Sequence, residues 1–194
     1  VKENSEFYGN PWTLPQGLYF QNFADAFTKA SMGSYMINSV IVTALALALL
    51  LVIALPAAYT LARYKFMGSK LLNILFMGGL FINVNYIVVP IFLMLVDADK
   101  ALKTWIGSGF FLNNLFITAL VYASTALPIT IYLLSGFFVT IPKDYEEAAF
   151  VDGSGYFRTM VTIMMPMAKP SIITVILFNF LAFWNEYIIS MTLL

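Results

Sequence analysis

Three long stretches of this chain contain no charged residue. They cover residues 30–62, 71–96 and 104–142, and a fourth uncharged stretch, residues 170–185, ends at Glu186. A helix needs ~20 predominantly apolar residues to cross the hydrocarbon core of a bilayer. The first three stretches meet this length, and the fourth nearly does. We therefore expect four transmembrane spans, at residues 35–62, 70–95, 111–139 and 170–194.

The amino-acid composition agrees with a membrane protein. Hydrophobic residues make up 61% of the 194 positions and charged residues only 10%, whereas soluble domains have ~45–50% apolar and ~25% charged residues. A soluble fold of this size could not cover so much apolar surface with so few charges. Residues 44–51 are apolar at every position, unlike the alternating strands of a membrane β-barrel. We expect an all-α, polytopic transmembrane helix bundle.

Other features of the composition exclude several classes of function. The net charge is zero, whereas a nucleic-acid-binding protein has a basic surface. The chain has no Cys and no His, so it lacks a thiol nucleophile and the commonest general base and metal ligand. We therefore expect no enzymatic activity, no metal site and no nucleic-acid partner. Because the chain has no initiator Met and stops within an apolar run, we expect a fragment trimmed at both ends.

The polar segments divide the chain into two predicted regions. Residues 1–34 are expected to form an extracytoplasmic loop and a short amphipathic helix around Phe20, Phe23 and Phe27. Residues 35–194 are expected to form the transmembrane domain. The connections between its spans are expected at residues 63–69, 96–110 and 140–169.

The distribution of basic residues predicts the orientation. The side that holds residues 63–70 and 140–169 carries six Lys or Arg, and the opposite side carries four. Cytoplasmic loops have an excess of Lys and Arg, and Trp is enriched at the membrane interfaces. Trp12, Trp105 and Trp184 all fall near the side with fewer basic residues. We therefore place residues 140–169 in the cytoplasm.

The segment 140–169 predicts two short helices. Asp144 is expected to cap the first helix, with Glu147 completing a capping box. Gly153 supplies the left-handed residue that ends it. Ser154 is expected to cap the second helix.

The second short helix is expected to run to Met165 and to end before Pro166. Pro170 is expected in the first turn of the last span, where its missing N–H is tolerated.

The same segment resembles the cytoplasmic "EAA" loop of the permease subunits of ATP-binding-cassette importers. That pattern is Glu-Ala-Ala, three residues, Gly, nine residues, Ile, one residue and Leu-Pro. At the same spacing this chain has Glu147, Ala148, Ala149, Gly153, Ile163 and Pro166, with Met165 in place of Leu. Further segments are similar to the carbohydrate-type branch of that family: residues 10–15, 55–66, 136–138, 141–142 and 183–187. Such subunits usually have six spans, so the first and the last are expected to be missing.

The resemblance implies that the first short helix docks in a groove on a separate ATPase subunit. Glu147 would offer a carboxylate to a basic group there, and Tyr145, Phe150 and Phe157 would be apolar anchors. The residues expected to couple the chain to the ATPase are Tyr145, Glu147, Ala148, Ala149, Asp152, Gly153, Phe157, Ile163 and Pro166. The alternative is an ordinary amphipathic helix on the membrane surface.

Polar side chains within the expected spans are candidates for a substrate path, because such groups usually face a cavity or another helix. The candidates are Asn83, Asn85, Tyr86, Asn179, Trp184, Asn185 and Glu186. Amide and carboxylate groups can bond sugar hydroxyls, and aromatic rings can stack on a sugar. The alternatives are interhelical hydrogen bonds for Asn83, Asn85 and Asn179 and contact with the lipid headgroups for Glu186. Pro56 and Pro128 are expected to kink their spans, as hinges or as static packing.

Together these features predict a permease subunit that carries a sugar or oligosaccharide across the bacterial cytoplasmic membrane by alternating access. Nothing in the sequence resembles a glycine-rich phosphate loop, so ATP is expected on the partner and no cofactor on this chain. The resemblance implies an ATPase dimer, a second homologous permease subunit and an extracytoplasmic solute-binding protein as partners, with membrane lipid around them. The alternative is an ion-coupled secondary transporter or channel, which would need titratable groups at the midplane.

Overall fold

The structure is a computed structural model that describes residues 2, 4–10, 12–14, 17, 19–29, 31–107 and 109–194. All regular secondary structure in these residues is helical, which confirms the expected all-α class. The chain divides into two compact units, Val1–Val40 and Ile41–Leu194.

The first unit contains two short helices, α1 (Asn4–Gly9) and α2 (Gln21–Thr28). Helix α2 is the predicted amphipathic helix, and α1 is an addition to the prediction. Asn22 Nδ2 donates to the carbonyl oxygen of Lys2 at 2.8 Å. This bond joins α2 to the segment that precedes it in the chain.

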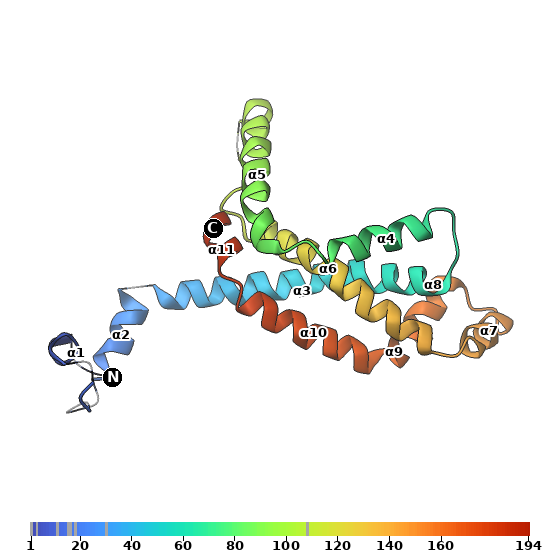
Figure 1. The fold of residues 1–194 in the computed structure, drawn as a ribbon, viewed down its shortest axis with the longest axis horizontal. Helices are drawn as coiled ribbons and strands as arrows, with labels where there is room; N and C mark the ends of the chain where they lie inside the picture. Colours follow the sequence, from blue (N-terminus) through green and yellow to red (C-terminus); the bar gives the residue numbers. More distant parts are fainter. Residues whose placement is uncertain are drawn as a thin grey trace. The chain divides into compact units, whose positions relative to one another are not determined.

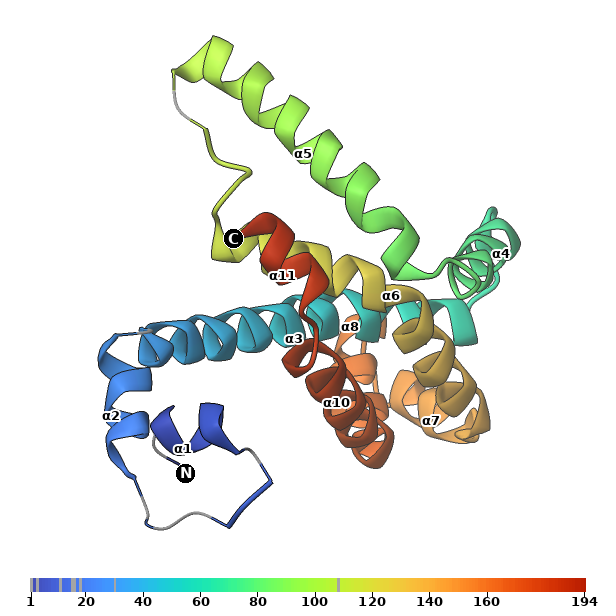
Figure 2. The same ribbon diagram turned by 60° about the vertical axis from the view of Figure 1, so that its left-hand side comes forward.

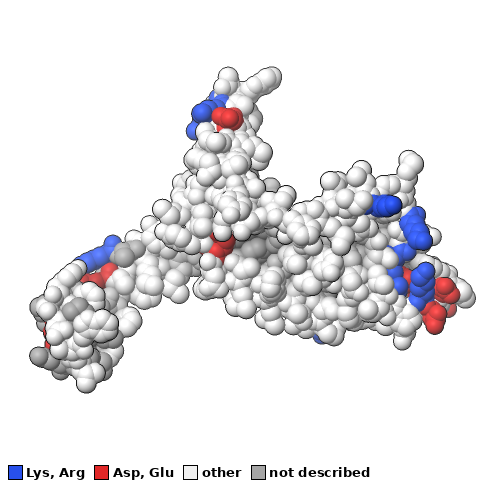
Figure 3. Space-filling model, viewed as in Figure 1, with Lys and Arg blue, Asp and Glu red and all other residues white. Residues whose placement is uncertain are grey.

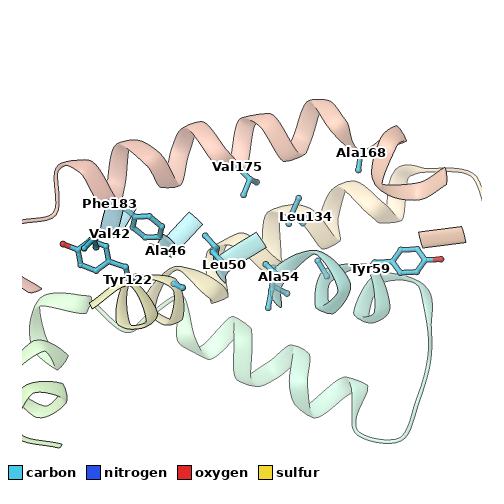
Figure 4. Close-up of a cluster of buried hydrophobic side chains, with 14 of the residues drawn as sticks. Val42, Ala46, Leu50, Ala54, Tyr59, Tyr122, Leu134, Ala168, Val175 and Phe183 are labelled. Carbon is cyan, nitrogen blue, oxygen red and sulfur yellow. The ribbon is translucent and has the colours of Figure 1, made fainter. Parts of the chain in front are cut away.

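Most of the core of the second unit comes from three apolar helices: α3 (Met32–Arg63), which begins in the first unit, α6 (Leu115–Thr140) and α10 (Lys169–Trp184). Figure 4 shows labelled side chains of all three helices meeting in this cluster. On α3 the buried residues recur every four positions: Ala46, Leu50, Ala54 and Ala58. This spacing places them on one helix face. One face of α3 therefore packs inward, although its residues 44–51 are apolar on every side.

The second expected span, residues 70–95, is wrong as one straight helix. Instead α4 (Ser69–Gly79) and α5 (Val84–Ile106) meet at a bend of 105°, which Figures 1 and 2 both show. Two features favour the break. Glycine weakens the end of α4, and the Asn83 side chain accepts a bond from the Asn85 N–H at 3.0 Å, which caps a new helix.

The loop expected at 96–110 is also wrong, because α5 continues to Ile106 and ends at Gly107, whose φ is 81°. Lys103 lies four residues after Asp99, and their side chains form an ion pair of 2.8 Å along the helix. Pairs at this spacing stabilise a helix. The charges that suggested a loop therefore support helix in this segment.

The last expected span, residues 170–194, is interrupted. Helix α10 ends at Trp184, and the short helix α11 (Ile188–Leu193) follows after three residues. Among the described residues, α3 and α6 are each long and apolar enough to cross a membrane alone. Up to four spans result if α4 with α5, and residues 156–167 with α10, each count as one bent span.

Pro56 and Pro128 lie within α3 and α6, and both helices continue through them.

The apolar exterior agrees with a membrane setting. In Figure 3 the charged side chains of the second unit gather around α7 and at the far end of α5, and the surface between them is almost uncharged.

Candidate functional site

Helix α7 (Asp144–Val151) is the first short helix of the segment 140–169. Lys143 already has helical backbone angles, and its carbonyl accepts bonds from the N–H groups of Glu146 and Glu147 at 2.9 and 3.0 Å. The expected Asp144 cap is therefore wrong. The helix starts one residue earlier than predicted. Asp144 lies in its first turn, where a negative charge interacts favourably with the helix dipole.

The end of α7 agrees with the prediction. Gly153 has a φ of 77°, and its N–H donates to the Phe150 carbonyl at 3.0 Å. The Ser154 N–H donates to the Ala149 carbonyl at 2.9 Å. These two bonds form a Schellman motif, which requires a residue that tolerates the left-handed conformation. Gly153 therefore ends α7 as expected.

The segment after α7 differs from the single helix expected. It consists of α8, a π-helix and α9, at Tyr156–Thr159, Met160–Met164 and Met165–Met167. Ser154 does not cap α8, and its Oγ accepts a bond from Thr159 Oγ1 instead. The wide π-turn, closed by the Met165 N–H on the Met160 carbonyl, accommodates Pro166 inside the segment. Pro170 occupies the first turn of α10 as expected.

Most residues predicted to couple the chain to an ATPase lie on the surface of this segment. Exposed residues of the set are Tyr145, Glu147, Ala148, Asp152, Gly153, Phe157 and Pro166. Ile163 is half-buried, and Ala149 is buried. The surface around α7 and α8 therefore combines exposed carboxylates with exposed aromatic rings, a combination that can dock a partner protein.

A buried ion pair holds the other face of α7. Arg63, the last residue of α3, places Nε 3.2 Å from Glu146 Oε2, and the two side chains are only 4% and 9% exposed. Arg63 Nη2 also donates to the Ile141 carbonyl at 2.7 Å. Tyr59 Oη donates to Glu146 Oε1 at 2.6 Å. We call Tyr59, Arg63 and Glu146 the α3–α7 cluster.

The sequence-based prediction missed this cluster, although two signals point to it. Consecutive residues on a helix are rotated by about 100° about its axis, so Glu146 and Glu147 cannot both face the same partner surface. Arg63 is the first charged residue after the apolar run of α3. If other segments of the protein bury that end of the helix, the Arg63 guanidinium needs a hydrogen-bond acceptor.

Aromatic rings extend the cluster. Tyr59 contacts Phe138 edge to face at 5.5 Å between ring centroids, and Tyr64 contacts Tyr156 in the same way. Tyr59 and Tyr64 share a hydrogen bond of 3.0 Å between their hydroxyl oxygens. Burial raises the pKa of Tyr64, so its hydroxyl stays protonated at neutral pH. Rings from α3, α6 and α8 thus surround the polar contacts of α7.

The predicted path residue Asn179 lies inside the helix bundle and is 1% exposed. Its Nδ2 donates to Thr130 Oγ1 at 3.1 Å and to the Val175 carbonyl at 2.8 Å. This arrangement is an interhelical bond between α10 and α6, the alternative given for this residue. Its contact with a substrate stays a prediction.

Glu186 lies at the break between α10 and α11 and organises it. Its carboxylate accepts bonds from the N–H groups of Ile189 and Ser190, which caps α11, and from Tyr122 Oη at 2.8 Å. Trp184 stacks on Phe180. The carboxylate is thus bonded within the protein, a role that the sequence did not suggest.

The remaining candidates lie at two helix breaks. Trp184, Asn185 and Glu186 follow one another where α10 ends, and Asn185 Nδ2 donates to the Leu181 carbonyl. Asn83, Asn85 and Tyr86 lie where α4 gives way to α5, and Tyr86 is 82% exposed. The structure therefore places these six residues at interruptions of helices and not within continuous spans.

A cavity of about 430 Å³ lies between α3, α4 and α6. Its lining is mainly apolar, with Asn73 and Ser135 as polar members, and includes none of the predicted path residues. No group of three or more acidic, His or Cys residues that could hold a metal occurs in the part of the chain that the structure describes.

The fold and this loop define a helical membrane protein of the transporter class, with a short surface helix inserted between two bundle helices. Residues 51–194 match the family described as binding-protein-dependent transport system inner membrane component, and the chain belongs to that family. It is therefore a multi-pass protein of the cytoplasmic membrane, as expected from the sequence.

Curated relatives and solved structures similar to this chain include two uptake permeases and one solved transporter structure. A diacetylchitobiose uptake system permease protein of Streptomyces coelicolor is 36% identical over 99% of this chain and 60% of the relative. A melibiose/raffinose/stachyose import permease protein of Bacillus subtilis is 32% identical over 93% of this chain and 62% of the relative. The chain therefore spans about three fifths of the length of these relatives.

The solved structure is a crystal structure of a bacterial ABC transporter involved in the import of the acidic polysaccharide alginate. Its TM-score is 0.77 at 23% identity, and the match covers 93% of this chain and 59% of the matched chain. This likeness shows that the two chains share a fold.

Proposed function

We propose that this chain is part of the permease subunit of an ATP-driven importer that carries a sugar or oligosaccharide. The observation that carries the proposal is the loop of residues 147–166, whose family spacing is intact and whose candidate docking residues are mostly exposed. Relatives named for diacetylchitobiose and for melibiose, raffinose and stachyose support the substrate class. Membership in a binding-protein-dependent family argues against the ion-coupled alternative.

In this mechanism α7 and α8 dock on an ATPase dimer, through Tyr145 and Glu147 of α7 and Phe157 of α8. ATP is bound and hydrolysed on that dimer, so this chain needs no cofactor. When the dimer closes, α7 is displaced, and the helices that flank the loop, α6 and α10, pivot. This motion opens the proposed substrate path to one side of the membrane and closes it to the other. A second homologous permease subunit and an extracytoplasmic solute-binding protein are the other partners in this mechanism.

The two helix breaks are the proposed substrate-contacting regions. Irregular backbone is tolerated at membrane depth only where it is buried in protein or lines a cavity. Both breaks present groups that bond hydroxyls or stack on rings: Asn83, Asn85, Tyr86, Trp184 and Asn185. Asn179 and Glu186 support these regions through their bonds within the bundle.

The substitution Glu147→Arg tests the docking role in the full-length subunit with its partners. We expect loss of ATPase subunits in a pull-down and loss of uptake of labelled diacetylchitobiose, because the exposed carboxylate is replaced by the opposite charge. Asp144→Arg is the matched control, since Asp144 is an exposed acid of the same helix outside the predicted set. Unchanged retention and uptake in Glu147→Arg would contradict the proposed function.

A further inference from the structure

Helix α7 is attached to a helix that is distant from it in sequence. Its neighbours along the chain are α6 and α8, yet Glu146 forms its ion pair and its tyrosine bond with α3, 83 and 87 residues earlier. The loop alone would connect α7 only to α6 and α10. The α3–α7 cluster therefore attaches α7 to α3 as well.

Separating Arg63 from Glu146 would cost free energy. Both charged side chains are almost fully buried, so pulling them apart would leave two unpaired charges in a poorly solvated place. The Arg63–Glu146 contact has the distance of an ion pair, without the alignment of a hydrogen bond at Nε. Arg63 Nη2 and Tyr59 Oη supply the aligned hydrogen bonds.

The attachment is also one-sided. Glu146 and Ala149 of α7 are buried, whereas Tyr145, Glu147 and Ala148 are exposed. One face of the same short helix thus meets its own subunit, and the other face is free for a partner. Force applied to the free face would pass through the buried face.

We infer that α7 and the adjoining end of α3 move as one rigid unit, with Glu146 and Arg63 as positioning residues. Helix α3 then follows α7 when the ATPase dimer closes, although it does not flank the loop. This inference rests on the proposed function, because it needs an ATPase that displaces α7.

The test measures distances between two spin labels in the full-length subunit, assembled with its partners. Residues 1–194 contain no Cys, so within this segment the labels attach at Thr60→Cys on α3 and Lys143→Cys at the start of α7. Any Cys elsewhere in the assembly is replaced by Ser. Distances are compared without nucleotide and with ATP bound to a hydrolysis-deficient ATPase. A second label pair on the two ATPase subunits shows that the dimer has closed.

We expect the distance between Thr60 and Lys143 to stay the same when the dimer closes. With Glu146→Gln added, ATPase subunits should still bind, but the distance should shift and its distribution should broaden on closure. Asp144→Asn, the same change at an exposed acid of α7, should behave like the unsubstituted protein. A simple effect on assembly would lower ATPase retention and leave the distance unchanged.

Two results would overturn the inference alone. One is a change of the distance on closure in the protein without Glu146→Gln, since α7 would then slide past α3. The other is an unchanged distance in Glu146→Gln, since the ion pair would then not hold the two helices together. Failure of the unsubstituted subunit to bind the ATPase would instead overturn the proposed function, and the inference with it.

Discussion

Replacing Glu146 by Leu leaves the Arg63 guanidinium buried, with the Ile141 and Pro142 carbonyls as its remaining acceptors. Removing one member of a buried ion pair destabilises a protein by about 3–5 kcal/mol, mainly because the other charge stays behind without a partner. Arg63→Met should destabilise similarly, since it leaves a buried carboxylate with only the Tyr59 hydroxyl. The double variant removes both charges, and its stability should lie within about 1 kcal/mol of the original, because apolar replacement of a whole pair is often neutral or stabilising.

Equilibrium unfolding of the full-length subunit in mixed detergent micelles, followed by tryptophan fluorescence, measures these differences. The two single variants and the double variant form a double-mutant cycle, whose coupling term should reach several kcal/mol. Asp97→Asn is the control. Asp97 forms an ion pair of 3.4 Å with Lys100 in which both side chains are more than two-thirds exposed. Its loss should leave the unfolding midpoint unchanged, because solvated surface pairs contribute little.

Two outcomes would refute this account. Single variants that each lose less than about 1 kcal/mol would show that the charges are solvated like a surface pair. A double variant that loses the sum of the two single effects would show that Arg63 and Glu146 act independently.

Three further predictions concern other parts of the bundle. Gly79→Ala should destabilise the subunit by about 1–3 kcal/mol in the same unfolding assay, because the added Cβ would lie 2.8 Å from Pro128 Cγ; no loss would contradict the close approach of α4 to α6. Asp99→Asn should speed hydrogen exchange in residues 109–111, since this buried carboxylate accepts bonds from two backbone N–H groups there; unchanged exchange would show that the bonds do not order the loop. Thr130→Val should lower stability by about 0.6 kcal/mol, the average for such membrane hydrogen bonds, and leave the KM for the transported sugar unchanged; a raised KM would favour substrate contact at Asn179.

Local features predicted much of the structure correctly. The length of the stretches without charged residues identified α3 and α6, because the bilayer excludes charge along the whole span. Gly153 was predicted to end α7, because the left-handed conformation at a helix end is a property of one residue and its neighbours. The loop spacing indicated the family for the same reason, since it lies within twenty consecutive residues. Each of these properties can be stated without knowing what packs against the segment.

Other features were decided only by tertiary structure. The charges of α5 look like a loop in sequence, yet they pair along a helix. Glu146 and Glu147 are indistinguishable by type, and only the position of Arg63, far away in the chain, determines that the first is buried and the second is free. The physical reason is that burial of a charge depends on which partner comes within bonding distance, and no local pattern encodes a contact between residues 83 positions apart.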